Sequence, residues 1–438
     1  MATIELSEHA DWKLFERVAY KLEHGLGGFW KEKNDGLDQR YWDLAVGDQT
    51  LTLHLEHYLG ISLYVPDHTD EIAQRVNALV KQNNASFFME AVVSELRRDN
   101  HFIPKLYLKN WAQDGKVLSY RLLVPHQKVP LWKAYPLKAI AFRQDLYTYT
   151  LGDQVTNEFE HWLDSEFESP AAEAVQRVVQ EKQLSRNDWK RLISFALCQD
   201  LRTPAHMRKF LERLHKTLPE MMNQTIDRCI TRLTHAAVHG TPLEINPKAL
   251  QPSSFDNCPF RLTSVPEPDG THTFKAEAAV GRRIWLWQMR MLLTETIKKI
   301  EPKGWTILHA PQGITWPTSD NPLIRVGMYH DGSYKFGTGW KSDKADILLP
   351  ISPKHLLHCN VGQRPVLRGT IVDRELAQTI RRIIVQHADQ YIFSIDPADI
   401  AELRPRVVDS QQHTEELQNW KNWGHEQDQI EKKFASGS

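Results

Sequence analysis

Residues 99–120, DNHFIPKLYLKNWAQDGKVLSY, place a titratable ring and a rigid proline directly before a strand-like segment. Pro104 fixes the local backbone, and the apolar side chains around it would hold the imidazole of His101 in place. These side chains are Phe102, Tyr107, Leu108 and Trp111. A partly buried imidazole with a carboxylate partner can act as an acid or a base near neutral pH. His101 is therefore a candidate catalytic residue, although one histidine among twenty is more often structural.

The segment TSDNPLI at residues 318–324 contains a second candidate. Asp320 and Asn321 favour an Asx-type turn, because their side chains can bond the backbone two residues further on. Pro322 biases Asn321 toward an extended backbone, so the turn can present Asp320 at the tip of a strand. A carboxylate fixed in this way suits a general base, a metal or a clamp for a cationic group. An ordinary turn is the simpler alternative.

Asp200 lies near the end of a helix that the sequence predicts from a cap at Ser185 or Asn187 to the residues before Pro204. Its position on the helical wheel points it inward, on the same face as the apolar stripe. An inward carboxylate in the last turn needs a cation or several donors nearby. The local candidates for that partner are Arg202, His206 and Arg208. A structural ion pair and a functional carboxylate are both compatible with this pattern.

His355 and His358 follow the strand-like segment ILLPISP and offer a second source of imidazole. The sequence contains no HExxH, GxSxG, P-loop or GxGxxG motif, which argues against zinc proteases, serine hydrolases and common nucleotide-binding folds. The four cysteines stand far apart and form no CxxC pair. We therefore expect no metal and no cofactor, and any hydrolysis would be metal-independent.

The composition is typical of a globular protein, with 438 residues of which 41% are hydrophobic and 25% are charged. The length predicts two or three packed units. A formal net charge of −1 argues against a strong nonspecific polyanion binder, although it is compatible with a local basic patch. No apolar run suggests a signal peptide, and no window reaches the roughly 18 apolar residues of a membrane span. We expect a cytoplasmic protein without membrane contacts.

The expected fold class is α+β, with a small N-terminal sheet-plus-helix unit ahead of a larger mixed domain. Residues 1–95 begin with a helical periodicity at about 7–25. A hairpin that turns at Gly47, a third strand at 61–65 and a helix at about 68–82 follow. The polar sheet face, which we expect to be half-exposed rather than catalytic, carries Thr52, His54 and Glu56. This unit resembles small bacterial immunity-type domains, which implies a protein partner.

The larger domain is expected in two parts. Residues 96–265 carry the His101 motif and are mainly helical, with Thr203 and Pro204 as the cap and first residue of a further helix. Residues 266–438 alternate between strand-like and helical segments and are expected to complete the same domain with a β-rich part.

Five ordered segments carry a resemblance to a known family. They are HFIPKLYLKNWAQDGKVLSY, AIAFRQDLYTY, FALCQDLRTP, TSDNPLI and LLPISPKHLL. Together they resemble the bacterial domain-of-unknown-function family DUF4238 over about residues 100–395. The positions that match its motifs are His101, Pro104, Tyr107, Gln199, Arg202, Thr203, Pro204, Ser319, Asp320, Asn321, Pro322, Pro350 and Pro353. Trp111 stands where phenylalanine is more usual in the family, which keeps an aromatic side chain at this position.

The resemblance implies that polar positions from three distant segments are family features, but it brings no reaction. The set that we expect to converge as catalytic residues is His101, Gln199, Arg202 and Asp320. Arg202 could bind a phosphate or carboxylate through two N–H groups, while His101 and Asp320 act as an acid–base pair on a phosphoester or glycosidic bond. The expected substrate-binding residues are Tyr107, Ser319, Asn321 and His355, and the expected structural residues are Asp200, Pro104 and Pro322.

Two classes of function fit these expectations. The first is a hydrolase or nuclease that acts on RNA or a nucleotide as a bacterial toxin or phage-defence effector, with residues 1–95 as a sensing or restraining module. The second is a non-catalytic immunity or antitoxin-like protein that binds another protein through the exposed sheet of residues 1–95. The sequence leaves the substrate and the oligomeric state open.

Overall fold

The computed structural model describes residues 2–7, 12–35, 39–56, 60–65, 72, 74–76, 78, 98–151, 154–240, 258–269, 272–300, 304–329 and 333–436. The chain divides into two compact units, Met1–Leu96 and Arg97–Ser438. Each unit has a hydrophobic core of its own. The fold class is α+β, because most helices and strands occupy separate segments instead of alternating in β–α–β units.

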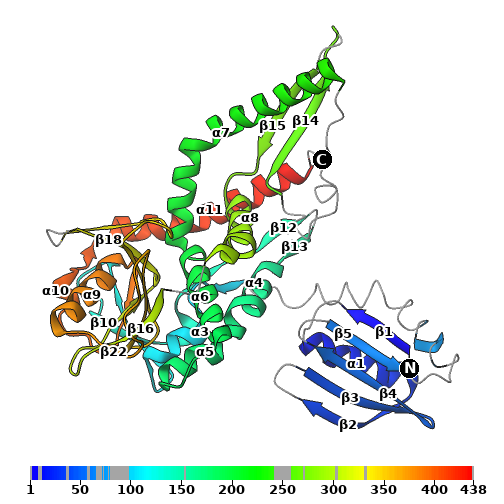
Figure 1. Ribbon diagram of the computed structural model, residues 1–438, viewed down its shortest axis with the longest axis horizontal. Coiled ribbons are helices and arrows are strands. Elements are labelled where there is room, and N and C mark those ends of the chain that lie inside the picture. Colours follow the sequence, from blue (N-terminus) through cyan, green and yellow to red (C-terminus); the bar gives the residue numbers. More distant parts are fainter. Residues whose placement is uncertain are drawn as a thin grey trace. The chain divides into compact units, whose positions relative to one another are not determined.

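The first unit is a five-stranded antiparallel sheet with a helix against one face (Figure 1). The strand order is β1-β5-β4-β3-β2. The elements are β1 Ala2–Ser7, α1 Trp12–Leu26, β2 Phe29–Asp35, β3 Gln39–Val46, β4 Gln49–Glu56 and β5 Gly60–Val65. Alternate residues of β4, such as Leu51 and Leu53, are fully buried in one cluster with Phe15 and Leu22 of α1. This alternation is what the sequence predicts for a sheet covered on one face.

Sequence and structure agree on the central strands of this sheet and differ at its edge. The predicted hairpin turns at Gly47, whose φ of 58° glycine adopts without strain. The largely polar segment FWKEKND, for which the sequence predicts no strand, forms the edge strand β2, paired with β3. An edge strand has one unpaired side open to water and therefore tolerates charged residues. The helix expected at about 68–82 lies largely outside the described residues.

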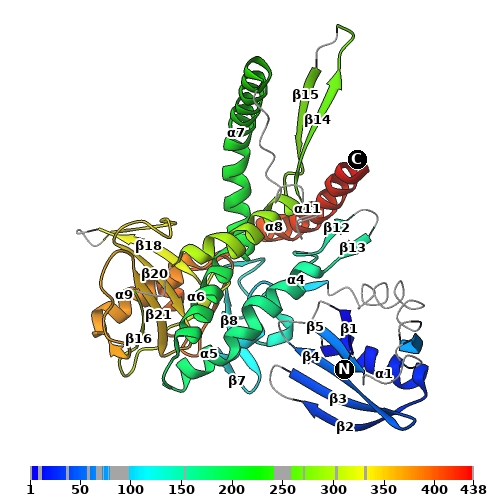
Figure 2. The ribbon, with the colours of Figure 1, turned by 45° about the vertical axis from the view of Figure 1, so that its right-hand side comes forward.

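The larger unit contains most of the helices. They are α3 Lys105–Leu108, η1 Lys109–Trp111, η2 Leu137–Ala139, α4 Glu158–Leu163, η3 Asp164–Glu168, α5 Ser169–Val179, α6 Arg186–Leu201, α7 Pro204–His239, α8 Arg282–Met291, η5 Leu292–Thr296, η6 Ile297–Lys299, α9 Arg374–His387, α10 Ile400–Leu403 and α11 Ser410–Ser436. Helix α7 extends away from α5 and α6 in both views (Figures 1 and 2). No helix in the described part of the chain is both long and apolar enough to cross a lipid bilayer.

The predicted junction between α6 and α7 is confirmed. Ser185 caps α6 in a capping box with Asp188. The hydroxyl of Thr203 accepts a hydrogen bond from an N–H in the first turn of α7, and Pro204 is the first residue of that helix. Two local features of the sequence, the cap at Thr203 and the proline at position 204, thus start a new helix directly after Arg202.

The larger unit contains two multi-stranded sheets, and the second of them joins segments from both ends of its sequence. One has the order β19-β18-β20-β21-β16-β22, and the other has the order β10-β8-β23-β17 with β7 paired to β8. The remaining pairs are β11-β6, β12-β13, β14-β15 and β24-β9. The strands are β6 Asp99–His101, β7 Ala112–Gln113, β8 Lys116–Arg121, β9 Leu123–Val124, β10 Trp132–Pro136, β11 Phe142–Gln144, β12 Tyr149–Leu151, β13 Gln154–Thr156, β14 Phe260–Pro266, β15 His272–Ala278, β16 Trp305–His309, β17 Thr318–Ser319, β18 Ile324–Met328, β19 Tyr334–Phe336, β20 Ala345–Pro350, β21 His355–Asn360, β22 Thr370–Ile371, β23 Tyr391–Phe393 and β24 Val407–Val408.

Candidate functional site

His101 and Arg202 are in direct contact. His101 ends strand β6, which pairs with β11 so that His101 lies opposite Phe142. Arg202 caps the C-terminal end of α6. Its Nη2 donates a hydrogen bond to the backbone carbonyl of His101 at 2.7 Å. The segments of His101 and Arg202, which the sequence predicts to converge, therefore meet in the fold.

The guanidinium of Arg202 is occupied by other groups of the protein. Its Nη1 forms an ion pair with Glu168, and its Nε donates to the hydroxyl oxygen of Tyr147 at 3.3 Å. Tyr147 in turn donates to the backbone carbonyl of Arg202 at 2.7 Å. The sequence predicts that Arg202 binds a substrate anion, but its side chain is only 1% exposed and its charge is already balanced by Glu168. Arg202 is therefore a positioning residue for the His101 segment.

The imidazole of His101 is half-buried, and its Nδ1 has no hydrogen-bond partner among the described residues. Burial, followed by the positive charge of Lys105, lowers the pKa of His101. The backbone of Ile140 acts in the opposite direction, and the charge of Arg202 lowers the pKa further, to about 4. The ring is therefore neutral at pH 7, and its buried Nδ1 has no hydrogen bond to any described residue.

Gln199 lies on α6, three residues before Arg202, and is completely buried. Neither Oε1 nor Nε2 of its amide has a hydrogen-bond partner among the described residues. An unpaired buried amide costs about 1–3 kcal/mol of folding free energy. A catalytic role for Gln199 would require a substrate to enter the interior, so this role stays a prediction.

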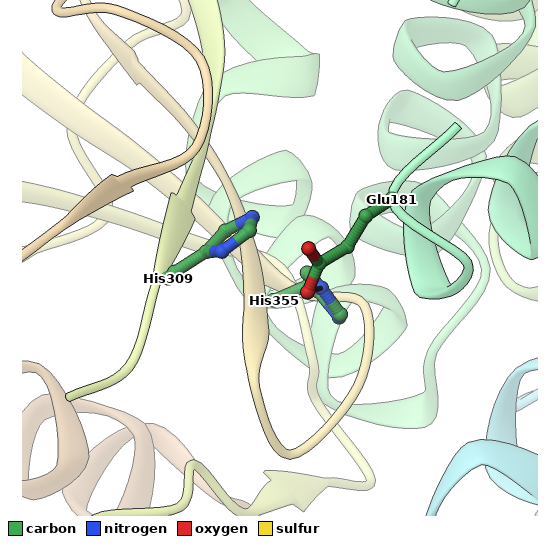
Figure 3. A group of neighbouring side chains, drawn as sticks. All are labelled: Glu181, His309 and His355. Carbon is green, nitrogen blue, oxygen red and sulfur yellow. Dashed lines mark ion pairs between the residues drawn. The ribbon is translucent and has the colours of Figure 1, made fainter. Parts of the chain in front are cut away.

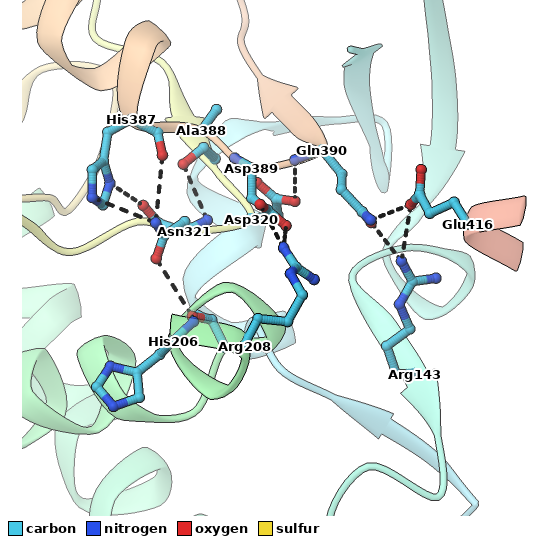
Figure 4. A network of polar contacts seen from close by, with 12 residues as sticks. Arg143, His206, Arg208, Asp320, Asn321, His387, Ala388, Asp389, Gln390 and Glu416 are labelled. Carbon is cyan, nitrogen blue, oxygen red and sulfur yellow. Dashed lines mark hydrogen bonds and ion pairs between the residues drawn. The ribbon is translucent and has the colours of Figure 1, made fainter. Parts of the chain in front are cut away.

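Asp320 follows β17 and is 3% exposed. Its Oδ1 accepts a hydrogen bond from the backbone N–H of Asp389 at 2.9 Å, and its Oδ2 accepts one from Gln390 at 2.7 Å (Figure 4). Burial and the neighbouring carboxylate of Asp389 raise the pKa of Asp320 to about 7. The sequence predicts a carboxylate presented at a strand tip, but the structure turns it inward, where it fastens the backbone that leads into β23.

The residues beside Asp320 are equally buried and extend this network. The hydroxyl of Ser319 accepts a hydrogen bond from the backbone N–H of Asn321 at 3.2 Å. Thr203 donates to Oδ1 of Asn321 at 3.4 Å, and Nδ1 of His387 lies 3.0 Å from the backbone carbonyl of Asn321 (Figure 4). Asn321, which was expected to bind substrate, thus connects the start of α7 with the end of α9, and Ser319, expected to do the same, supports Asn321.

Tyr107 and the two prolines that were expected to be structural, Pro104 and Pro322, have structural positions. The hydroxyl of Tyr107 donates to the backbone carbonyl of Pro350 at 2.6 Å and lies 2.7 Å from Oγ1 of Thr318. Pro104 precedes α3 as its N-cap residue, and Pro322 is buried. Tyr107 was expected to bind substrate, but it is fully buried and instead joins the segments around Thr318 and Pro350.

Asp200 forms the structural ion pair that its inward position predicts, but with a distant partner. Its Oδ2 lies 3.2 Å from Nε of Arg325 and accepts a hydrogen bond from the indole of Trp340 at 2.8 Å. Two of the three local partners expected from the sequence are engaged elsewhere, whereas the charge of Asp200 acts on His206 and partly opposes the burial that lowers the pKa of that histidine. Arg202 pairs with Glu168, and Arg208 pairs with Asp389.

The three predicted segments therefore meet, but they meet through buried hydrogen bonds. Of the four catalytic candidates, only His101 is partly exposed, and the other three are buried. None of the four lines the surface pocket of about 320 Å³ beside Trp305 and Trp340. His101 is thus the one partly exposed member of this set of four, and its unpaired Nδ1 lies on the buried side of the ring.

His355 belongs to a different group of side chains. Its Nδ1 lies 2.8 Å from the hydroxyl of Ser352, and its Nε2 lies 3.6 Å from Oε1 of Glu181. Its ring packs edge-on against that of His309, with centroids 4.7 Å apart (Figure 3). Burial and the neighbouring His309 lower the pKa of His355 to about 4. The other predicted imidazole, His358, pairs with an aspartate of β20.

The sequence identified His355 in this group but missed its two neighbours. Glu181 and His309 come from distant segments, and neither belongs to a recognisable motif. Glu181 follows α5 with a φ of 56°, a conformation that glycine usually adopts at the end of a helix. This unusual residue choice marks the position, but it can be recognised only once the end of α5 is known.

Comparison with known families accounts for most of the chain. Residues 2–80 match a family described as "Protein of unknown function (DUF3630)". No curated protein and no solved structure matches the chain. The immunity-like character of the first unit therefore stays a prediction. Residues 99–397, which include the segments of His101, Arg202 and Asp320, match the family described as "Protein of unknown function (DUF4238)". Because this match spans well over half of the sequence, the protein belongs to the DUF4238 family.

Proposed function

We propose that this protein is a hydrolase that acts on a phosphoester of RNA or a nucleotide, with His101 as its acid–base residue. The observation that carries the proposal is the setting of this imidazole. Arg202 holds its backbone at 2.7 Å, its ring is partly exposed, and its Nδ1 is free of hydrogen bonds within the described chain. A buried polar atom without a partner is uncommon unless it has a ligand or a chemical role.

The charges around His101 favour an anionic substrate. The charged side chains that act on the ring are the cations Lys105 and Arg202. Because Glu168 balances Arg202 inside the protein, the exposed Lys105 is the cation that a substrate anion can meet. A phosphate bound beside His101 would offset their effect and raise the pKa of the imidazole from about 4 toward neutrality. An imidazole in that range exchanges protons efficiently at pH 7. An uncharged glycosidic bond would give no such activation, so a phosphoester is the better substrate class.

In this mechanism the neutral ring of His101 accepts the proton of the attacking water or ribose hydroxyl. The resulting imidazolium then donates a proton to the leaving oxygen, so the ring ends as it began. Arg202 acts as a positioning residue through the His101 backbone, and Asp320 acts by fixing the backbone at residues 389 and 390. No cofactor takes part in these steps.

The cellular role that we propose is that of a cytoplasmic effector of toxin or phage-defence type. The division of the chain into two compact units supports an arrangement in which residues 1–95 sense or restrain the larger unit through a protein partner. Expression of the chain in bacteria should then slow growth, and His101→Ala should remove the effect.

The direct test is hydrolysis by the purified full chain in the presence of a chelator. Transfer RNA, total RNA and free nucleotides are the substrates, and cleavage is followed by gel and by chromatography. His101→Ala should lower the rate about 100-fold or more, the usual contribution of an acid–base residue. The matched control is His126→Ala, an exposed histidine of the same unit. Equal rates for His101→Ala and the parent, with both folded by circular dichroism, would end the proposal.

A second candidate function is a non-catalytic protein that binds another bacterial protein. The hydrogen bonds and ion pair of Arg202 and Asp320 are all made to other groups of the protein among the described residues. Such a network can serve stability alone, which favours a function without catalysis. Thr52 lies on the first sheet, where its hydroxyl donates to Asp43 at 2.6 Å. A stoichiometric complex that survives His101→Ala but is lost with Thr52→Arg would support this function over hydrolysis.

A further inference from the structure

Glu181, His309 and His355 converge although they come from three distant segments. His309 ends β16 and His355 begins β21, and the two are register partners in the antiparallel pair. Side chains at directly opposed positions lie on the same face of a sheet. Glu181, in the loop after α5, points its carboxylate toward this pair (Figure 3). One ligand atom of each residue lies within 4.8 Å of the other two.

The two ring nitrogens of His355 have different surroundings. Nδ1 lies 2.8 Å from the hydroxyl of Ser352, whereas Nε2 is buried and makes no hydrogen bond to any described residue. His355 as a whole is 3% exposed, so water does not freely solvate the ring. Nε2 faces Glu181 at 3.6 Å, which is too long for a hydrogen bond. One nitrogen anchored by a neighbour and the other left open toward a carboxylate is the arrangement of a metal-binding histidine.

We propose that Glu181, His309 and His355 form a binding site for a divalent transition-metal ion, with Zn²⁺ as the best fit. Two imidazoles and one carboxylate are a ligand set that zinc uses when a fourth position stays open. Zinc bonds of about 2.0–2.2 Å in a tetrahedron separate the ligand atoms by about 3.3–3.6 Å. The 3.6 Å between His355 and Glu181 already meets this spacing. Side-chain rotation of the partly exposed His309 and the exposed Glu181 can close the remaining distance.

Two cations surround the site and compete with the ion. Nζ of Lys354 pairs with Oε1 of Glu181 at 2.6 Å, and the charge of Arg368 acts on His309. Lys354 is exposed and flexible, so its ammonium can move away when a metal takes the carboxylate. The metal-bound form would tie the end of α5 to the sheet of β16 and β21. This site departs from the expectation that the chain uses no metal, and it does not depend on the proposed hydrolysis.

The test is equilibrium binding of Zn²⁺ to the full chain after removal of metal by a chelator, by calorimetry and by metal analysis. Glu181→Gln and His309→Asn should each weaken binding at least about 10- to 100-fold, the range seen even for residues that only support a ligand. Lys354→Gln should strengthen binding several-fold, because it removes the competing charge. An increase in affinity is a result that general damage to the fold does not produce.

Matched controls separate this site from incidental zinc binding. His235 and His239 lie one turn apart on the exposed part of α7, with tilted rings whose centroids are 4.4 Å apart, and could take up zinc themselves. His239→Asn should therefore leave the tight site intact, as should Glu173→Gln on the exposed face of α5. His355 is buried, so the decisive variants are those of the two more exposed ligands, each checked for a parent-like melting curve.

Zinc should also raise the melting temperature of the parent and of both controls, but not that of Glu181→Gln. Absence of stoichiometric binding by the parent would overturn the proposal. Binding that is unchanged in both Glu181→Gln and His309→Asn would overturn it as well. Neither result bears on the RNA and nucleotide assay, which contains a chelator and has His101→Ala as its own readout.

Discussion

The guanidinium of Arg202 donates a hydrogen bond to the backbone carbonyl of His101 at 2.7 Å and so connects two motifs that lie 101 residues apart. The same guanidinium is paired with Glu168 inside the protein. The hydrogen bond therefore fixes the backbone position of His101, while the charge of Arg202 is neutralised by Glu168 inside the protein. We therefore expect substitutions of Arg202 to change mainly the stability of the fold.

Arg202→Met should lower the free energy of unfolding by about 3–5 kcal/mol, because it leaves Glu168 without its buried partner. Urea denaturation of the full chain, followed by tryptophan fluorescence, measures the change. Arg177→Met, which removes an exposed i,i+4 pair with Glu173, should leave the transition unchanged. Similar transitions for the two variants would show that the Arg202 network contributes little to stability.

Asp320→Asn should destabilise the fold by about 1–3 kcal/mol, because an amide has one oxygen for the two backbone N–H groups of Asp389 and Gln390. The raised pKa of about 7 gives this loss a pH dependence. Because the pKa of Asp320 is higher in the folded protein than the value of about 3.8 in the unfolded chain, the proton on this carboxyl stabilises the folded state. This stabilisation is complete below pH 3.8 and is lost as the pH rises through 7. The loss in the variant should therefore be larger at pH 5 than at pH 8; the reverse order would contradict this account.

His387 gives a pH effect of opposite sign. Burial lowers its pKa from 6.5 to about 4, so the unfolded chain binds a proton that the folded chain does not. Stability from this group is complete above pH 6.5 and falls as the pH drops toward 4, by up to about 1.4 kcal/mol per pH unit. His387→Gln should flatten the acid limb of a stability–pH curve. His101 and His355 are lowered in the same direction and keep part of the slope.

Gln199→Met should raise the free energy of unfolding by about 1–2 kcal/mol, because it replaces an unpaired buried amide by an apolar side chain of similar shape. Gln180→Met, at an exposed position after α5, serves as the control and should have no effect. Chemical denaturation measures both variants. Loss of stability in Gln199→Met would instead reveal an internal polar partner for the amide.

Glu181→Gly should raise the melting temperature and abolish zinc binding together. Glycine adopts the φ of 56° without the steric cost that a Cβ brings. Glu181→Ala removes the carboxylate but keeps the Cβ, so it should lose the metal without gaining stability. If glycine and alanine give equal melting temperatures, backbone strain at this position is negligible.

The elements that the sequence predicted well are those with strong local signals. Three features depend only on neighbours in the chain. They are the helix cap at Ser185, the cap and proline at Thr203 and Pro204, and the alternation across Gly47. The sequence does not predict the edge strand β2, because an edge strand is exposed to water and tolerates polar residues. Such a strand lacks the apolar alternation that identifies a half-buried strand. The ion pair of Asp200 was anticipated, but its partner Arg325 lies on a strand more than a hundred residues away.

The sequence by itself determined the α+β class, the helix boundaries around Arg202 and the set of polar motifs, because helix caps, prolines and apolar periodicity act over a few residues. Only the tertiary structure decided which motif side chains are accessible. It buried Arg202 and Asp320 in hydrogen bonds, left His101 partly open, and brought Glu181 and His309 beside His355. The physical reason is that burial and charge pairing depend on which distant segments pack together, and no spacing along the chain encodes that contact.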